Sequence, residues 1–201
     1  MEIKTFTVGV LATNCYVVSC LETKKSIIID PGLGSASEAS KIIQFTKKNN
    51  LEMEYIVNTH GHSDHISGNL VLKKKFDVPI CINSYDAYFL DRLDGNVEKP
   101  ILLGDQREVK FGRTTLKVLH TPGHTLGSIS LVGKAQVFTG DTLFAGGIGR
   151  TDFPESSENE MKLSLRKLMK LPDNFIIYPG HGPQSSIIQE RHFNPFLKYF
   201  N

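Results

Sequence analysis

The sequence predicts an α/β fold in which antiparallel and mixed sheets are covered by helices. Strand-like apolar runs alternate with amphipathic helical segments along all 201 residues, and short polar turns join some strands as hairpins. No Ser-, Gly- or Pro-rich linker and no shift in composition divides the chain. We therefore expect a single domain over residues 1–201.

In the first half, strands are expected over residues 3–8, 14–20 and 26–30, the last two joined by the polar turn 22–25. A helix begins at Ser35, because Ser35 and Glu38 form a capping box, and continues to residue 50. Residues 55–57 form a buried strand. A helix over 67–76, a strand over 79–83 and a helix over 84–93 follow.

The second half repeats this alternation. Strands are expected over residues 108–111, 114–119, 128–132 and 136–138. A helix over 158–171, a buried strand over 175–178 and a C-terminal helix from residue 185 complete the chain. Residues 57–62 resemble residues 118–124, since each is a strand that runs into a His loop. This similarity fits two like halves that meet at one site.

Composition excludes several classes of protein. The hydrophobic content of 40% and charged content of 22% are typical of a soluble globular protein, and a net charge of +2 does not indicate a nucleic-acid partner. The N-terminus lacks an apolar signal segment and no run has the ~18 apolar residues of a membrane span, so we expect a cytoplasmic protein with no membrane partner, as a monomer or small homo-oligomer. Three cysteines without a C-x-x-C pair are expected to be core residues.

The strongest functional signal is the stretch His-Gly-His-Ser-Asp-His at positions 60–65, directly after a buried strand. Imidazoles crowded into one polar turn repel one another when protonated unless they share a cation. A loop at a strand end can turn successive side chains toward one point. The stretch therefore predicts a metal site built from His60, His62, Asp64 and His65.

Four further residues lie in Gly-containing loops at the ends of predicted strands: Asp30, His124, Asp141 and His181. Taken alone, each would be an ordinary loop residue. Because open sheets gather ligands at strand ends, the four loops are expected to converge on one pocket with the first His loop. Two other histidines stay outside this set. His120 is expected to be a core residue or to support a ligand, and His192 lies in the terminal helix.

In order and spacing, these residues resemble the ligand set of the metallo-β-lactamase superfamily, and the similarity extends from Asn14 to the C-terminus. The resemblance implies a four-layer αβ/βα sandwich of two mixed sheets, with helices outside and metals at one edge. It also implies a first metal held by His60, His62 and His124, a second held by Asp64, His65 and His181, and Asp141 as the bridge between them.

Within the superfamily, residues 140–144, 148–153 and 179–183 resemble the glyoxalase II-like hydrolases, particularly the short bacterial ones, which cleave thioesters such as S-lactoylglutathione. Two departures fall where that family binds its thiol. The chain ends before a full C-terminal helical region, and Arg150 is followed two positions later by Asp152 in place of an aromatic residue.

The resemblance implies a metal-dependent thioesterase whose partner is a small-molecule thioester and whose nucleophile is a hydroxide that bridges two divalent ions. Asp64 is the expected catalytic residue, orienting the bridging water or accepting its proton. Asp30 is expected to fix a ligand from outside the coordination sphere, and Arg150 to bind an anionic part of the substrate. Imidazole and carboxylate suit zinc, iron and manganese, with zinc our first choice.

Two alternatives stay open. Persulfide dioxygenases of the same superfamily share the Gly-Arg-Thr-Asp-Phe sequence at 149–153 and use one iron, whose ligands here would be His60, His124 and Asp141. A metal-binding or electron-transfer module is disfavoured, because diiron flavoprotein relatives place an acidic residue where His62 stands. A β-lactamase proper is disfavoured by the absent signal peptide and by Asp141 in place of Cys, and a nuclease by the absence of a basic track.

Overall fold

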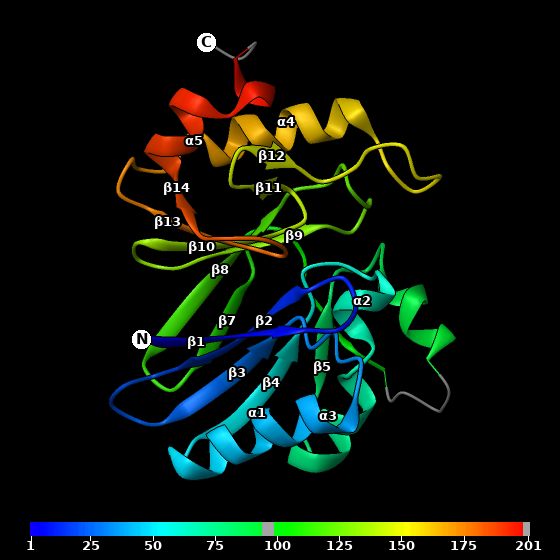
Figure 1. Ribbon diagram of the computed structural model, residues 1–201, viewed down its shortest axis with the longest axis vertical. Coiled ribbons are helices and arrows are strands. Elements are labelled where there is room, and N and C mark those ends of the chain that lie inside the picture. The colour runs from blue at the N-terminus through cyan, green and yellow to red at the C-terminus, as the bar shows by residue number, and fades with distance from the viewer. Residues whose placement is uncertain (94–98, 199–201) are drawn as a thin grey trace.

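Two mixed sheets stack face to face in the computed structural model, which describes residues 1–93 and 99–198 (Figure 1). The first sheet has the strand order β1-β2-β3-β4-β5-β6 and comes from the first half of the chain. Its strands are β1 (Glu2–Val8), β2 (Thr13–Ser19), β3 (Lys25–Ile29), β4 (Glu52–Val57), β5 (Ile80–Ile82) and β6 (Ile101–Leu102).

The second sheet has the order β14-β13-β10-β9-β8-β7 and comes from the second half. A two-stranded β11–β12 hairpin lies beside it. The strands of the second sheet are β7 (Glu108–Phe111), β8 (Thr114–His120), β9 (Ile129–Val132), β10 (Gln136–Gly140), β13 (Ile176–Pro179) and β14 (Ser185–Ser186). The hairpin consists of β11 (Leu143–Phe144) and β12 (Gly147–Ile148).

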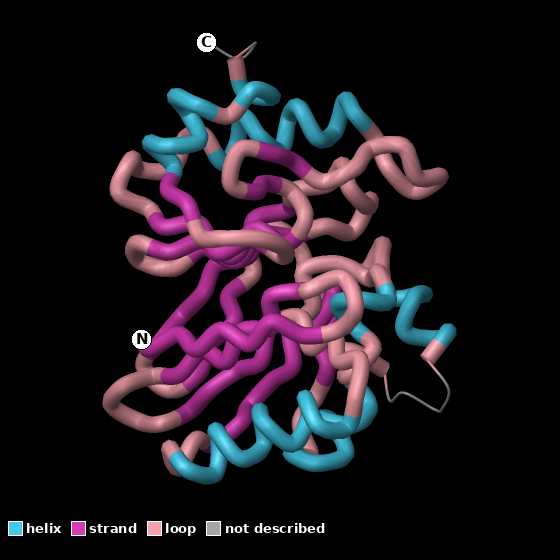
Figure 2. The backbone as a smooth tube through the Cα atoms, in the orientation of Figure 1, coloured by secondary structure: helices cyan, strands magenta, loops and turns pink. Residues whose placement is uncertain are grey.

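Helices cover the outer faces of both sheets (Figures 1 and 2). Helices α1 (Ala36–Lys48) and α3 (Asn69–Phe76) cover the first sheet, and α4 (Glu158–Leu168) and α5 (Ile187–Phe193) cover the second. This is the four-layer αβ/βα sandwich that the family resemblance implies. No helix of the described residues is long and apolar enough to cross a membrane.

Strand β3 shows how the sequence produces these layers. Ile27, Ile28 and Ile29 are all fully buried. Successive strand side chains point to opposite faces, so Ile27 and Ile29 pack between the sheets while Ile28 packs against the helices. A continuous apolar run is what a strand covered on both faces requires.

The direction of the strands brings the functional loops to one edge of the sandwich. Strands β3 and β4 are parallel, and so are β10 and β13. Strand β8 also runs in the direction of β10, because each of them is antiparallel to β9. The loops after β4, β8, β10 and β13 therefore leave their sheets at neighbouring positions.

The structure differs from the expected elements mainly in short segments. The helix expected over residues 84–93 is a 3₁₀ helix, η1 (Ala87–Arg92), and residues 185–186 are strand β14 before α5 begins. The Glu38 carboxylate does not close a capping box on Ser35. It accepts hydrogen bonds from the backbone N–H of Gly34 (2.7 Å) and of Gly9 (3.2 Å). Strands β6, β11 and β12 have two residues each and carry no periodicity that a sequence could reveal.

Candidate metal centre

The seven residues expected to be ligands lie together at one edge of the sandwich, on loops from both sheets. Part of the first His loop is helical, because Asp64 and His65 lie in the short helix α2 (Ser63–Ile66). The side-chain ligand atoms of the seven residues form three groups, and within each group the atoms lie within 4.8 Å of one another. The groups are His60, His62 and His124; His60, His65 and Asp141; and Asp64, His65 and His181.

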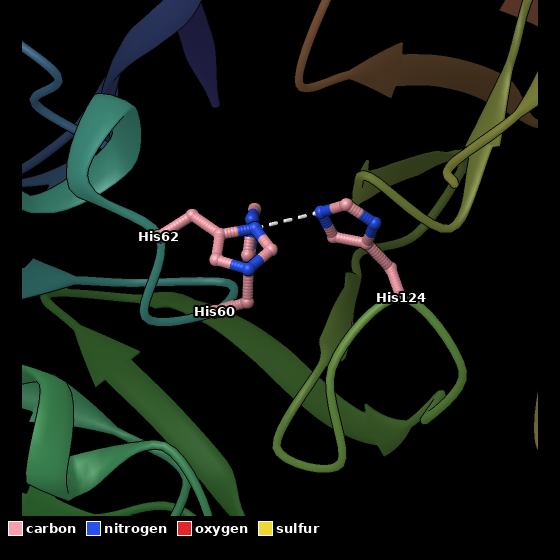
Figure 3. A group of neighbouring side chains, drawn as sticks. All are labelled: His60, His62 and His124. Carbon is pink, nitrogen blue, oxygen red and sulfur yellow. Dashed lines mark hydrogen bonds between the residues drawn. The ribbon is translucent and has the colours of Figure 1, made fainter. Parts of the chain in front are cut away.

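The first group brings the loop after β4 against the loop after β8 (Figure 3). His62 Nδ1 and His124 Nε2 face each other at 2.8 Å. His60 is buried, and its Nε2 has no hydrogen-bond partner among the described residues. A buried imidazole nitrogen without a partner is costly in an apolar interior, and a cation would satisfy it.

Asp141 lies between the group of His60, His62 and His124 and the group of Asp64, His65 and His181. Its Oδ1 is 3.4 Å from His65 Nε2, and its Oδ2 is 3.4 Å from His181 Nε2 and 3.6 Å from His124 Nε2. Gly180 makes this approach possible, because a Cβ there would lie 2.1 Å from Asp141 Oδ1. The carboxylate can thus contribute an oxygen to each group.

Each of the five imidazoles turns its other ring nitrogen to an oxygen atom. His60 Nδ1 lies 3.2 Å from Thr59 Oγ1, and His62 Nε2 lies 3.0 Å from Glu155 Oε1. The remaining contacts are His65 Nδ1 to Asp30 Oδ2 (3.1 Å), His124 Nδ1 to Arg150 O (2.9 Å) and His181 Nδ1 to Leu11 O (3.1 Å). Outer contacts of this kind orient metal-binding histidines and fix their tautomers.

Asp30 is buried directly after β3 and holds the first His loop. Its Oδ1 accepts a hydrogen bond from Thr59 N (2.7 Å), and its Oδ2 accepts one from Thr59 Oγ1 (2.6 Å). The same Oδ2 contacts His65 Nδ1. Asp30 therefore lies outside the ligand groups and holds the backbone and one imidazole of the first His loop.

Electrostatics divide the imidazoles into two kinds. Burial and the neighbouring His65 hold the pKa of His60 well below its usual range. Burial also lowers the pKa of His181, but hydrogen bonds to Asp141 and Asp64 outweigh it and raise this pKa to about 9. Burial would raise the pKa of Asp64, yet hydrogen bonds from His181 and His65 bring it well below the usual value. Without a metal, the group of Asp64, His65 and His181 is thus a set of ion pairs.

We expect metal binding to release protons at pH 7.5. His181 is protonated in the metal-free protein below its pKa of about 9, whereas a metal-binding imidazole must be neutral. Metal affinity should therefore rise with pH up to about 9. The ion pairs of His181 stabilise the metal-free fold fully below the unfolded pKa of about 6.5, and that contribution is lost as pH rises through about 9. Calorimetric titration in buffers of different ionisation enthalpy measures the protons released, and equal heats in all buffers would contradict this expectation.

Two acidic residues that support the centre gave no recognisable sequence signal. Glu155 contacts His62 from a loop 93 positions away. Asp86 is buried and accepts hydrogen bonds from Gly61 N (2.8 Å), Thr125 Oγ1 (2.7 Å) and Gly127 N (2.9 Å). Asp86 thereby ties the first His loop to the loop that carries His124.

Glu155 offers a direct test of the outer contacts. We expect Glu155→Gln to weaken metal binding at the first group about tenfold, because the amide keeps the shape but loses the charge that supports His62. Competition with a chromophoric chelator measures this affinity. Glu158→Gln is the matched control, since Glu158 is exposed and pairs with Lys162 on α4. Equal affinities in the two variants would remove this role from Glu155.

Arg150 and the two excluded histidines occupy different surroundings. The Arg150 side chain is exposed and donates two hydrogen bonds to Asp152 (2.9 and 2.8 Å), while its backbone oxygen contacts His124. His120 is half-buried and belongs neither to the core nor to a ligand group. Its Nε2 contacts Leu126 O. His192 Nδ1 contacts Ile188 O within α5. The cysteines are free and buried, as expected.

The chemistry of these side chains fits divalent metal ions. Imidazole nitrogens and carboxylate oxygens are donors that zinc, iron and manganese share. The centre presents an unpartnered nitrogen of His60 and an unpartnered oxygen of Asp141, both buried. The ligand groups share His60 and His65, so they adjoin one another.

Comparison with known proteins gives relatives over nearly the full chain. The sequence profile of the metallo-β-lactamase superfamily matches residues 8–181. The hydroxyacylglutathione hydrolase GloC of Haemophilus influenzae is 36% identical over 98% of this chain and 98% of its own. The mitochondrial persulfide dioxygenase ETHE1 of Mus musculus is 34% identical over 92% of this chain and 71% of its own.

Solved structures agree with this relationship. The BLEG-1 B3 metallo-β-lactamase superimposes with a TM-score of 0.87 at 33% identity, over 98% of this chain and 100% of that one. TTHA1623 in a di-iron-bound form gives a TM-score of 0.83 at 31% identity, over 96% and 100%. With its fold, its His/Asp cluster and a profile match over most of its length, the chain belongs to the metallo-β-lactamase superfamily.

Proposed function

We propose that this protein is a metal-dependent hydrolase that cleaves thioesters, with a small-molecule thioester such as S-lactoylglutathione as substrate. The observation that carries the proposal is the position of Asp141, whose Oδ1 faces His65 in one ligand group and whose Oδ2 faces His124 in the other. Two ions sharing one carboxylate are the arrangement of binuclear hydrolases. Similarity to a hydroxyacylglutathione hydrolase over 98% of both chains supports the thioester as the bond cleaved.

We assign the ligands as two sets joined by Asp141. His60, His62 and His124 would hold the first ion, and Asp64, His65 and His181 would hold the second. Two divalent ions bound there would lower the pKa of a shared water to near neutrality and polarise the substrate carbonyl. Zinc is our first choice, and the di-iron form of TTHA1623 makes iron the second.

The residues around the ions position the reaction. Asp64 is the residue we assign to handling the proton of the attacking water. Its Oδ2 lies 3.2 Å from His181 Nε2 and accepts a hydrogen bond from Thr13 Oγ1 at 3.2 Å, so the carboxylate is held in one orientation. Asp30 orients His65 in the same way from the outside.

Persulfide dioxygenase is the second candidate, because the mouse ETHE1 enzyme is 34% identical over 92% of this chain. That activity would need one iron, for which we assign His60, His124 and Asp141. His124 Nε2 and Asp141 Oδ2 lie 3.6 Å apart, so these residues are close enough to share an ion. The Asp64, His65 and His181 set would then have no catalytic use.

One preparation separates the candidates. Elemental analysis of protein purified without added metal counts the ions, and the same sample is assayed with a thioester panel, with nitrocefin, and for oxygen uptake with glutathione persulfide. The hydrolase predicts two ions per chain, thioester hydrolysis, loss of that activity with a chelator and its return with zinc. One iron with oxygen uptake and no hydrolysis would overturn the hydrolase in favour of the dioxygenase.

A further inference from the structure

An open cleft of about 390 Å³ adjoins the metal centre on the side of His62 and Asp64. His62 belongs to the first ligand set and Asp64 to the second, so a molecule in the cleft can reach both proposed ions. The cleft has largely apolar walls and one cationic side chain, Arg92. The apolar walls are formed by Ile66, Phe89, Leu93 and Phe153.

Arg92 is held next to the centre by aromatic contacts. Its guanidinium lies over the rings of Phe89 and Tyr88, 5.1 and 5.4 Å from their centroids. The Phe89 ring in turn lies 5.7 Å from the His62 ring. Phe89 also fills the space beside Gly61, where a Cβ would come within 2.2 Å of the aromatic ring. A single aromatic side chain therefore separates Arg92 from a proposed metal ligand.

The charge of Arg92 is available to a ligand. Within residues 1–93 and 99–198, no carboxylate forms an ion pair with Arg92, and the side chain is exposed at the cleft. Arg150 differs, because Asp152 binds its guanidinium through two hydrogen bonds. The two acidic residues of the cleft already have partners, because Glu155 contacts His62 and Asp64 contacts His65 and His181. A guanidinium on an aromatic face keeps its planar fork of N–H donors for a carboxylate.

We propose that this cleft binds the part of a thioester that extends beyond the scissile bond, and that Arg92 binds a terminal carboxylate of that part. The substrate class is thus an anionic thioester with an apolar middle section, and the anchoring cation is Arg92 rather than Arg150. The inference rests on the proposed function for the identity of the bond cleaved. The carboxylate belongs either to the thiol half or to the acyl half.

Matched substrate pairs test this assignment on the metal-loaded protein. S-acetyl-3-mercaptopropionate and its propionamide counterpart differ by one charge on the thiol half. S-succinyl- and S-butyryl-N-acetylcysteamine differ by one charge on the acyl half. The variants are Arg92→Gln, Arg92→Lys and the control Arg113→Gln. Arg113 lies in the turn between β7 and β8, at the far end of β8 from the metal centre, and pairs with Glu22.

We expect Arg92→Gln to raise KM about tenfold for the carboxylate of one pair, while kcat and the neutral partner change by less than about twofold. Arg92→Lys should retain part of the preference, and Arg113→Gln all of it. The pair that responds identifies the half that carries the charge. An equal change for charged and neutral substrates, or no change in either pair, would overturn the role of Arg92.

A binding measurement keeps this inference separate from the proposed function. Thioether analogues of the first pair, 3-(methylthio)propionate and its amide, cannot be hydrolysed, and ligand-observed NMR reports their binding. Thioether analogues of the second pair are measured in the same way. Carboxylate preference that disappears in Arg92→Gln supports the cleft even if no thioester is cleaved. Thioester hydrolysis by the wild type without a carboxylate preference in any pair would overturn the role of Arg92 but not the proposed hydrolase activity.

Discussion

Asp141→Ala is expected to lower kcat/KM for thioester hydrolysis by at least about a thousandfold and to reduce the metal content from two ions to one or none. The reason is that this carboxylate faces His65, His124 and His181 at 3.4 to 3.6 Å and so belongs to both ligand sets. Loss of the shared ligand removes the electrostatic stabilisation that both ions would give the reaction. Steady-state kinetics with elemental analysis of the same sample measure both effects.

Asp173→Ala is the matched control for Asp141→Ala. Asp173 is half exposed and forms an ion pair with Arg191 away from the metal centre. Surface ion pairs contribute on the order of 0–1 kcal/mol to stability, so the metal content and activity of the Asp173→Ala variant should equal those of wild type. Full activity of Asp141→Ala with two bound ions would show that the carboxylate does not bridge them.

Asp30→Ala is expected to reduce both stability and metal binding. It leaves the buried Thr59 N–H, the Thr59 hydroxyl and His65 Nδ1 without their common partner. Such losses cost about 3 kcal/mol in total, equivalent to a fall in Tm of roughly 6–12 °C in a chain of this size. His65 also loses its orienting contact, which should weaken the second metal set about 10- to 100-fold.

Asp30→Asn separates these two effects. Asp30 has a φ of +51°, which Asn tolerates better than Ala, and the Asn amide oxygen can still accept from Thr59. We therefore expect a smaller fall in Tm than for Asp30→Ala, with a comparable loss of metal affinity. Differential scanning calorimetry of the metal-free proteins and chelator competition measure the two quantities. A Tm for Asp30→Ala within one degree of wild type would contradict the buried role of Asp30.

Long elements were predictable because each contains its own signal. The helix that begins at Ser35 has an N-cap whose side chain accepts from Glu38 N, and the run Ile27 to Ile29 has the continuous apolar character of a covered strand. Helix α2 and strands β6, β11 and β12 were not predictable, since two to four residues are too few for any period to appear. His120 was misjudged for a related reason. It ends a strand as the ligands do, but nothing in the sequence shows which way its ring points.

The sequence by itself determined the fold class and the residue types gathered at one edge. The fold class and these residue types can be read from local sequence, because strand alternation, helix caps and strand-end His and Asp residues each involve only neighbouring positions. Only the tertiary structure decided which atoms meet: Glu155 with His62, Asp30 with His65, Asp152 with Arg150, and Arg92 at the cleft. Contacts to a metal ligand from 35 or 93 positions away depend on how two sheets pack, and single polar residues in loops carry no periodic signal of that packing.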